Sequence, residues 1–114
     1  MAVKLTTIQD LHNYFSGVVQ RATHHAPNVD EIIYILLGMI IAYKDSGTDI
    51  NVSGQKSGTG NLLWVHIKGT HYAFQYDHLS ASIKIHKNSY RGTLINTINN
   101  KTTLQQLCNI FNNL

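Results

Sequence analysis

The sequence predicts an α+β domain: two N-terminal helices, an antiparallel meander of three to four strands and a C-terminal helix, with the helices packed on one sheet face. Its length of 114 residues fits one domain, residues 1–114. Apolar residues recur at helical spacing near both ends of the chain, and they alternate with polar ones between residues 62 and 87. Helices grouped around a run of strands are typical of antiparallel α+β proteins.

The first helix is predicted to begin at Thr6 or Thr7, with Gln9 or Asp10 as the capping-box partner. Pro27 ends it, because proline disfavours helical geometry in the residue before it. Its apolar face consists of Ile8, Leu11, Phe15, Val18, Val19 and Ala22.

The second helix is predicted to run from an N-cap at Asn28 to about Lys44. Asp30 and Glu31 would lie in its first turn, where the helix dipole favours acidic side chains. Residues 32–41 are so uniformly apolar that a helix formed by them would have no polar stripe along its surface. A helix that is apolar all round is buried on most sides or covered by a partner subunit.

Residues 45–60 form a long polar stretch, which we expect to be flexible apart from a short edge strand at Ile50 and Val52. Its glycines suggest a phosphate-binding loop. The required spacing is absent, because Lys56 and Ser57 precede Gly58.

Three strands are then predicted at Leu62–Lys68, Thr70–Tyr76 and Ala81–Lys87, joined by turns at 68–69 and 79–80. A fourth follows at about Thr93–Ile98. The two turns set registers that agree on one inward face, which supports a meander because a one-residue slip would invert every side chain. The inward residues are Leu63, Val65, Ile67, Tyr72, Phe74, Tyr76, Ile83 and Ile85.

The last helix is predicted to be capped by Thr102 or Thr103, with Gln105 or Gln106 completing a capping box. Its apolar face comprises Leu104, Leu107, Cys108, Phe111 and Leu114.

The same registers place a tryptophan, three histidines and a lysine on the opposite sheet face, with His66 and His71 as direct cross-strand neighbours. We call this candidate binding surface the Trp64 face. It comprises Leu62, Trp64, His66, His71, Ala73, Lys84 and His86.

Four interpretations of the Trp64 face are open. A partner or homodimer surface is favoured, because tryptophan is a typical interface anchor. A nucleic-acid surface would normally present two or more exposed aromatic residues, and here only Trp64 is well placed. The three histidines could bind a metal ion, or the face could simply be solvated.

Composition excludes several classes. The single cysteine, Cys108, allows neither an intrachain disulfide nor a cysteine-based zinc site. The N-terminus has no signal-peptide pattern, and the apolar stretch at 32–43 is too short to span a bilayer, so we expect a cytoplasmic protein without membrane contact. The six acidic residues are explained by helix starts, loops and turns, so no catalytic residue, metal or cofactor is predicted.

Charge is unevenly distributed. Residues 1–60 carry four basic and five acidic side chains, a net charge of −1. Residues 61–114 carry five basic and one acidic, a net charge of +4. A basic C-terminal half is compatible with an acidic partner or with nucleic acid.

The segment from Trp64 to Phe74, followed by Ser89-Tyr-Arg-Gly92 and by Asn99-Asn-Lys-Thr102 before the final helix, resembles small orphan proteins of bacterial integron gene cassettes. The resemblance covers the C-terminal half. It implies an oligomeric bacterial accessory protein of unknown biochemical role, and it transfers no functional residue.

We therefore predict a small binding protein that acts through a protein–protein surface as a homodimer, without catalysis. An unidentified protein partner is the other form of this hypothesis. The alternatives are a nucleic-acid-binding module using the Trp64 face, and a small-ligand-binding protein or enzyme with a histidine-containing pocket.

Overall fold

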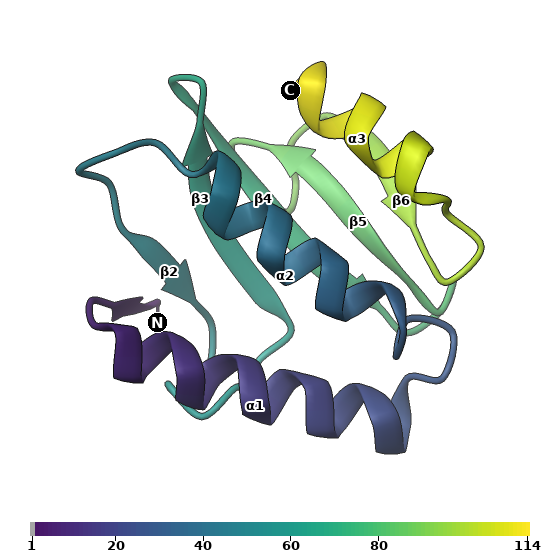
Figure 1. The fold of residues 1–114 in the computed structure, drawn as a ribbon, viewed down its shortest axis with the longest axis horizontal. Coiled ribbons are helices and arrows are strands. Elements are labelled where there is room, and N and C mark those ends of the chain that lie inside the picture. The colour runs from purple at the N-terminus through teal and green to yellow at the C-terminus, as the bar shows by residue number, and fades with distance from the viewer. Residues whose placement is uncertain (1) are drawn as a thin grey trace.

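The computed structural model describes residues 2–114, which form three helices and six strands (Figure 1). The α+β class and the antiparallel sheet are confirmed, whereas the expected three to four strands were too few. The elements in chain order are β1 (Val3–Leu5), α1 (Ile8–His25), α2 (Ile32–Tyr43), β2 (Ile50–Val52), β3 (Leu62–Ile67), β4 (Thr70–Asp77), β5 (Ser82–Lys87), β6 (Leu94–Ile98) and α3 (Leu104–Asn112).

The strands form one sheet in the order β1-β2-β3-β4-β5-β6. The sequence did not predict β1, which pairs Val3 with Val52 and Leu5 with Ile50. Three residues are too few for an alternation to show, and this pairing joins distant parts of the chain. As a result, β2 is not the edge strand that we expected.

The predicted registers of β3, β4 and β5 are confirmed, including Val65 opposite Tyr72 and Phe74 opposite Ile85. The inward face is buried, except that Tyr76 is half-buried. In the first turn Lys68 and Gly69 both have positive φ, at 51° and 79°, as the tight hairpin turn requires. The Asp45 carboxylate accepts the N–H groups of both turn residues at 2.8 Å.

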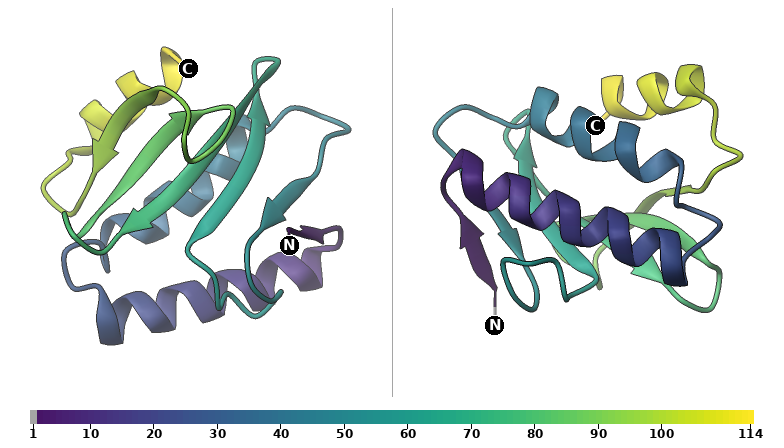
Figure 2. Two further views of the ribbon diagram at one scale, coloured as in Figure 1. Left: turned by 180° about the vertical axis from the view of Figure 1, so that it is seen from behind. Right: turned by 60° about the horizontal axis from the view of Figure 1, so that its bottom comes forward.

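The helices only partly follow the predicted packing. In Figures 1 and 2, α2 and α3 cover one face of the sheet, whereas α1 lies beside α2 along the end where β3 begins and β4 ends. Within residues 2–114, the opposite face has no helix over it (Figure 2, left). The prediction that all helices pack on one face is therefore wrong for α1.

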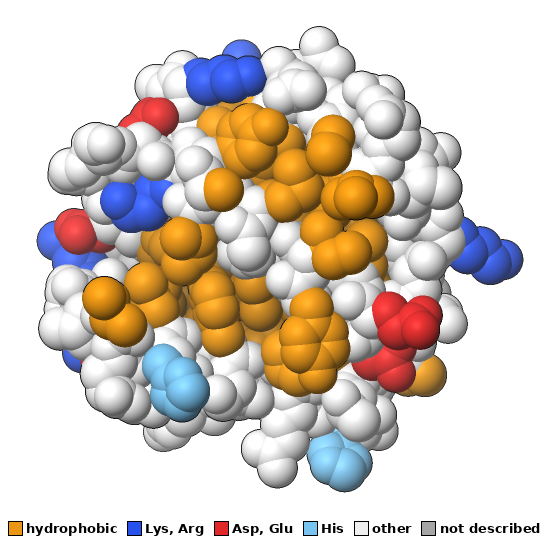
Figure 3. All heavy atoms as spheres, in the orientation of Figure 1, with side chains coloured by type: hydrophobic (Ala, Val, Ile, Leu, Met, Phe, Trp, Pro, Cys, Tyr) orange, Lys and Arg blue, Asp and Glu red, His pale blue; other side chains and the backbone are white. Residues whose placement is uncertain are grey.

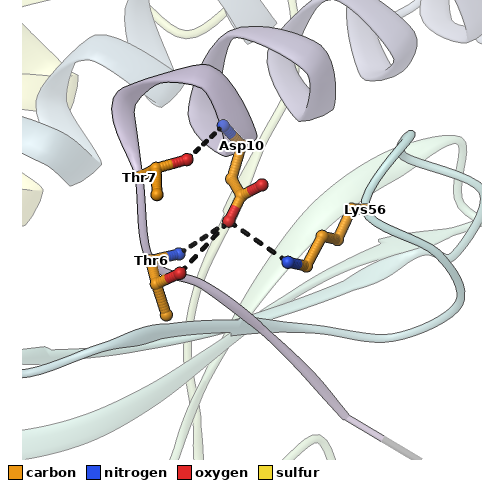
Figure 4. A network of polar contacts seen from close by, with 4 residues as sticks. All are labelled: Thr6, Thr7, Asp10 and Lys56. Atoms are coloured by element: carbon orange, nitrogen blue, oxygen red, sulfur yellow. Dashed lines mark hydrogen bonds and ion pairs between the residues drawn. The ribbon is translucent and has the colours of Figure 1, made fainter.

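The start of α1 matches the predicted cap (Figure 4). The Thr7 hydroxyl accepts the N–H of Asp10 at 3.0 Å, and the Asp10 carboxylate accepts the N–H of Thr6 at 3.0 Å. Lys56 Nζ lies 3.3 Å from the same carboxylate. This network ties the polar segment before β3 to the first turn of α1.

The start of α2 differs from the prediction. The helix begins at Ile32, and its cap comes from Asn100 rather than Asn28. The Asn100 Oδ1 accepts the N–H groups of Glu31 and Ile32 at 3.1 and 3.0 Å, while its Nδ2 donates to Pro27 and Asp30. A cap from 68 residues away leaves no local sequence signal.

The predicted capping box of α3 is present, between Thr103 and Gln106. Leu107 and Phe111 are fully buried, as expected for the apolar face. Leu104, the first residue of the helix, is 59% exposed and does not belong to the buried face.

Candidate functional site

The seven residues of the Trp64 face lie together on the side of the sheet that carries no helix. Trp64 pairs with Ala73 and Ala73 with His86 across three strands, and Gln75 in the next row separates Leu62 from Lys84. Ala73 is fully buried, whereas the other members are half-buried. The structure therefore brings the predicted residues onto one surface.

His66 and His71 form a stacked pair on this face, with ring centroids 4.6 Å apart and an interplanar angle of 28°. The Nδ1 atom of His66 is buried and has no hydrogen-bond partner within residues 2–114. Burial, and then the neighbouring His66, hold the pKa of His71 below its ordinary value. The neutral form of the His71 imidazole is therefore favoured.

His86 does not join this pair. Its Nδ1 donates to the carbonyl of Gly92 at 3.0 Å, which holds the ring against the loop before β6. Throughout the described residues, no group of three or more His, Cys, Asp or Glu side chains is placed to hold a metal ion. The metal interpretation of the three histidines therefore has no geometric support.

Lys84, the cation of the Trp64 face, is paired with Asp77 at 3.2 Å. The hydroxyl of Ser80 also donates to Asp77, and these contacts lower the Asp77 pKa to about 2, with Ser80 as the larger cause. The lysine charge is thus neutralised locally, which weakens the nucleic-acid interpretation.

A second surface lies on the outer side of α2. Ile33, Leu36, Leu37 and Ile40 face the core and are buried, but the opposite side of this helix is apolar and exposed. We call it the α2 face. Tyr34 is 61% exposed and Ile35 42%. The α2 face comprises Tyr34, Ile35, Gly38, Ile41 and Ala42.

Figure 3 shows hydrophobic side chains along α2 and in the hollow between α2 and α1, with charged side chains toward the rim. The apolar pattern of residues 32–41 predicts a helix that is covered on most sides. In the single chain, only one side of α2 receives that cover.

A cavity of about 120 Å³ lies between α1, α2 and the ends of β3, β4 and β5. His25, His78, Tyr14 and Tyr76 are among its lining residues, so a pocket containing histidine exists, as the small-ligand alternative required. No Asp or Glu lines it, and within residues 2–114 these four side chains form no hydrogen bond with one another. The cavity therefore offers space for binding without an assembled acid–base pair.

No pattern in the sequence indicates this cavity, because the cavity depends on the position of α1. Residues 53–60, which we call the strap, fix that position. Gly17 allows the backbone of α1 to touch Ser57, since a Cβ atom on Gly17 would lie 1.8 Å from the Ser57 carbonyl oxygen. Arg21 Nη1 donates to the carbonyls of Gly58 and Gly60. Gly58 also packs closely on α1, since a Cβ atom there would lie 3.0 Å from the Tyr14 carbonyl oxygen.

These features define a small α+β protein with an open sheet face, an exposed apolar helix and a cavity between its helices and sheet. No helix within residues 2–114 has the length and apolarity needed to cross a membrane. The chain belongs to the family described as integron cassette protein VCH_CASS1 chain, whose model matches residues 11–108. This confirms the resemblance to integron cassette proteins and extends it over most of the chain. A comparison with curated proteins gives no match.

Proposed function

We propose that this protein is a non-catalytic cytoplasmic binding protein that forms a homodimer through the α2 face. The observation that carries the proposal is the exposed apolar stripe in the middle of a helix with no charged residue between Ile32 and Tyr43. Exposed apolar surface of this kind is typical of protein interaction sites.

A second copy of the chain fits this surface because the α2 face can meet itself across a two-fold axis. When two α2 helices pack antiparallel, Glu31 at one end lies near Lys44 of the other copy, and the helix dipoles are opposed. Glu31 forms no ion pair within residues 2–114. A Cβ atom on Gly38 would meet none of the described residues within 4 Å, so the helices can approach closely at this central position.

The Trp64 face is less suited to the same contact. Trp64 itself is half-buried, and Lys84 is already engaged by Asp77. Burying that ion pair in an interface would cost desolvation energy.

The test is the mass in solution, measured by light scattering after size-exclusion chromatography. We expect the wild-type chain to have the mass of two copies and Ile35→Lys to have the mass of one. The matched control is Leu79→Lys, which places the same charge on a 99% exposed residue in the turn after β4. This control should remain dimeric.

A charge exchange tests the antiparallel arrangement. Glu31→Lys should weaken the dimer through repulsion with Lys44, and the double variant Glu31→Lys with Lys44→Glu should restore it. A monomeric wild-type chain would refute the proposal. Loss of the dimer in Trp64→Ala, with Ile35→Lys still dimeric, would move the contact to the Trp64 face.

A further inference from the structure

We propose that the cavity between α1, α2 and the sheet binds a small aromatic monocarboxylate, with its ring among the apolar side chains and its carboxylate on Arg21. The proposal concerns the inner side of α2 and does not depend on the dimer.

The size and lining of the cavity set the apolar part of the ligand. A dry apolar cavity of about 150 Å³ accommodates benzene, so a space of about 120 Å³ open at one side suits a single six-membered ring. The side chains that would surround the ring include Val18, Ala22, Val29, Leu36, Leu37 and Phe74.

Arg21 sets the charged part of the ligand. This residue lines the cavity and is exposed, so it lies where the cavity meets solvent. Within residues 2–114 its guanidinium pairs with no carboxylate and bonds only two strap carbonyls, both through Nη1. A guanidinium has five N–H donors and binds carboxylates through two parallel hydrogen bonds. The strap carbonyls hold Arg21 in place and leave Nη2 and Nε available for such a ligand.

The surrounding groups favour a monoanion with an apolar body. No acidic side chain lines the cavity, and His25 and His78 lie at its rim. Burial raises the pKa of Tyr14 to about 12, so this hydroxyl stays neutral and does not oppose an anion. An inorganic phosphate would leave the apolar wall unfilled, and a neutral hydrocarbon would make no use of Arg21.

The probes are benzoate and benzyl alcohol, which share the ring and differ in charge. Binding is followed by calorimetry and by methyl NMR of the wild-type protein. A charge-assisted contact supports a preference of roughly tenfold or more for benzoate. We expect that preference, with the largest shifts at the methyl groups of Val18 and Leu36.

Arg21→Gln should reduce benzoate binding to the level of benzyl alcohol. Arg91→Gln, which removes the charge of an arginine in the loop before β6, should leave both affinities unchanged. Equal binding of the two probes by the wild-type protein, no binding of either probe, or an equal loss in both arginine variants would overturn the proposal.

Two variants test the location through the apolar wall. Ala22→Leu should fill the cavity and abolish binding of both probes, although Arg21 is intact. The larger side chain of Ala22→Leu also strains the core. Leu37→Ala is therefore a second variant, with the opposite effect on the cavity volume. It should enlarge the cavity and allow 2-naphthoate, which the wild-type protein excludes, to bind. Benzoate binding that is indifferent to both variants would place the ligand elsewhere. The mass of the dimer should not change in any of these variants. A failure of ligand binding can therefore be distinguished from a failure of the proposed dimer.

Discussion

The imidazole rings of His66 and His71 stack across β3 and β4 at 4.6 Å. They are directly opposed residues in the sheet register. A proton on His71 would place a cation against the neighbouring ring in a partly buried site, and burial already disfavours that charge. His71 is therefore a pH-sensitive residue on the Trp64 face.

We predict that His71 makes the protein less stable in mild acid. The pKa of His71 is lower in the folded chain than its ordinary value of 6.5, mainly through burial and then through His66. The unfolded chain therefore binds more protons as the pH falls, so this contribution is fully present above pH 6.5 and is lost as the pH falls through the folded pKa.

Urea unfolding between about pH 7.5 and about pH 5 measures this effect. His71→Gln should lose part of the acid-dependent decrease in the free energy of unfolding. His24→Gln, at the exposed end of α1, is the control and should keep it. An identical pH dependence in wild type and His71→Gln would contradict the prediction.

The sequence was sufficient for the parts of the fold with local periodic signals. Alternation and two tight turns determined the register of β3, β4 and β5, and hence the composition of the Trp64 face. The parts that it missed depend on distant partners. The three residues of β1 pair with β2, and Asn100 caps α2 from the far end of the chain. The cavity depends on where the strap holds α1, which no pattern within α1 specifies.

We predict that Asn100→Ala destabilises the protein by about 2 kcal/mol, since a helix cap contributes ~1 kcal/mol and the lost bonds to Pro27 and Asp30 add to it. Chemical denaturation would measure the change. Asn13→Ala is the matched control, because Asn13 is exposed on α1 and its side chain bonds only Gln9 among residues 2–114. A loss in Asn100→Ala no larger than in this control would mean that Asn100 does not cap α2.

The ionisation of Asp77 provides a direct test of the contacts around Lys84. Its pKa of about 2 is caused first by the Ser80 hydroxyl, which donates at 2.7 Å, and then by Lys84. We therefore predict that Ser80→Ala raises the Asp77 pKa toward its ordinary value of 3.8 by more than Lys84→Met does. Carboxyl NMR titration of both variants decides the order. A larger rise in Lys84→Met would show that charge, rather than the hydroxyl contact, controls this carboxylate.

Gly17 and Gly38 allow the same substitution to be compared in two helices. Replacing glycine by alanine within a helix favours folding by about 0.5–1 kcal/mol when the new methyl group has space. At Gly38 nothing lies within 4 Å of the added Cβ atom, so Gly38→Ala should stabilise the protein by this amount. At Gly17 the Cβ atom would lie 1.8 Å from the Ser57 carbonyl oxygen, a contact that forces α1 and the strap apart.

Overpacking of this kind costs about 1–3 kcal/mol, which exceeds the gain in helix propensity, so Gly17→Ala should be destabilising. Both variants are best made in the Ile35→Lys background, where dimer formation does not contribute to the measurement. Urea unfolding gives the two free energies, and opposite signs are expected. Because the strap also holds Arg21 through its carbonyls, Gly17→Ala should weaken benzoate binding more than benzyl alcohol binding. Stabilisation by Gly17→Ala equal to that by Gly38→Ala would mean that the strap does not pack on α1 as described.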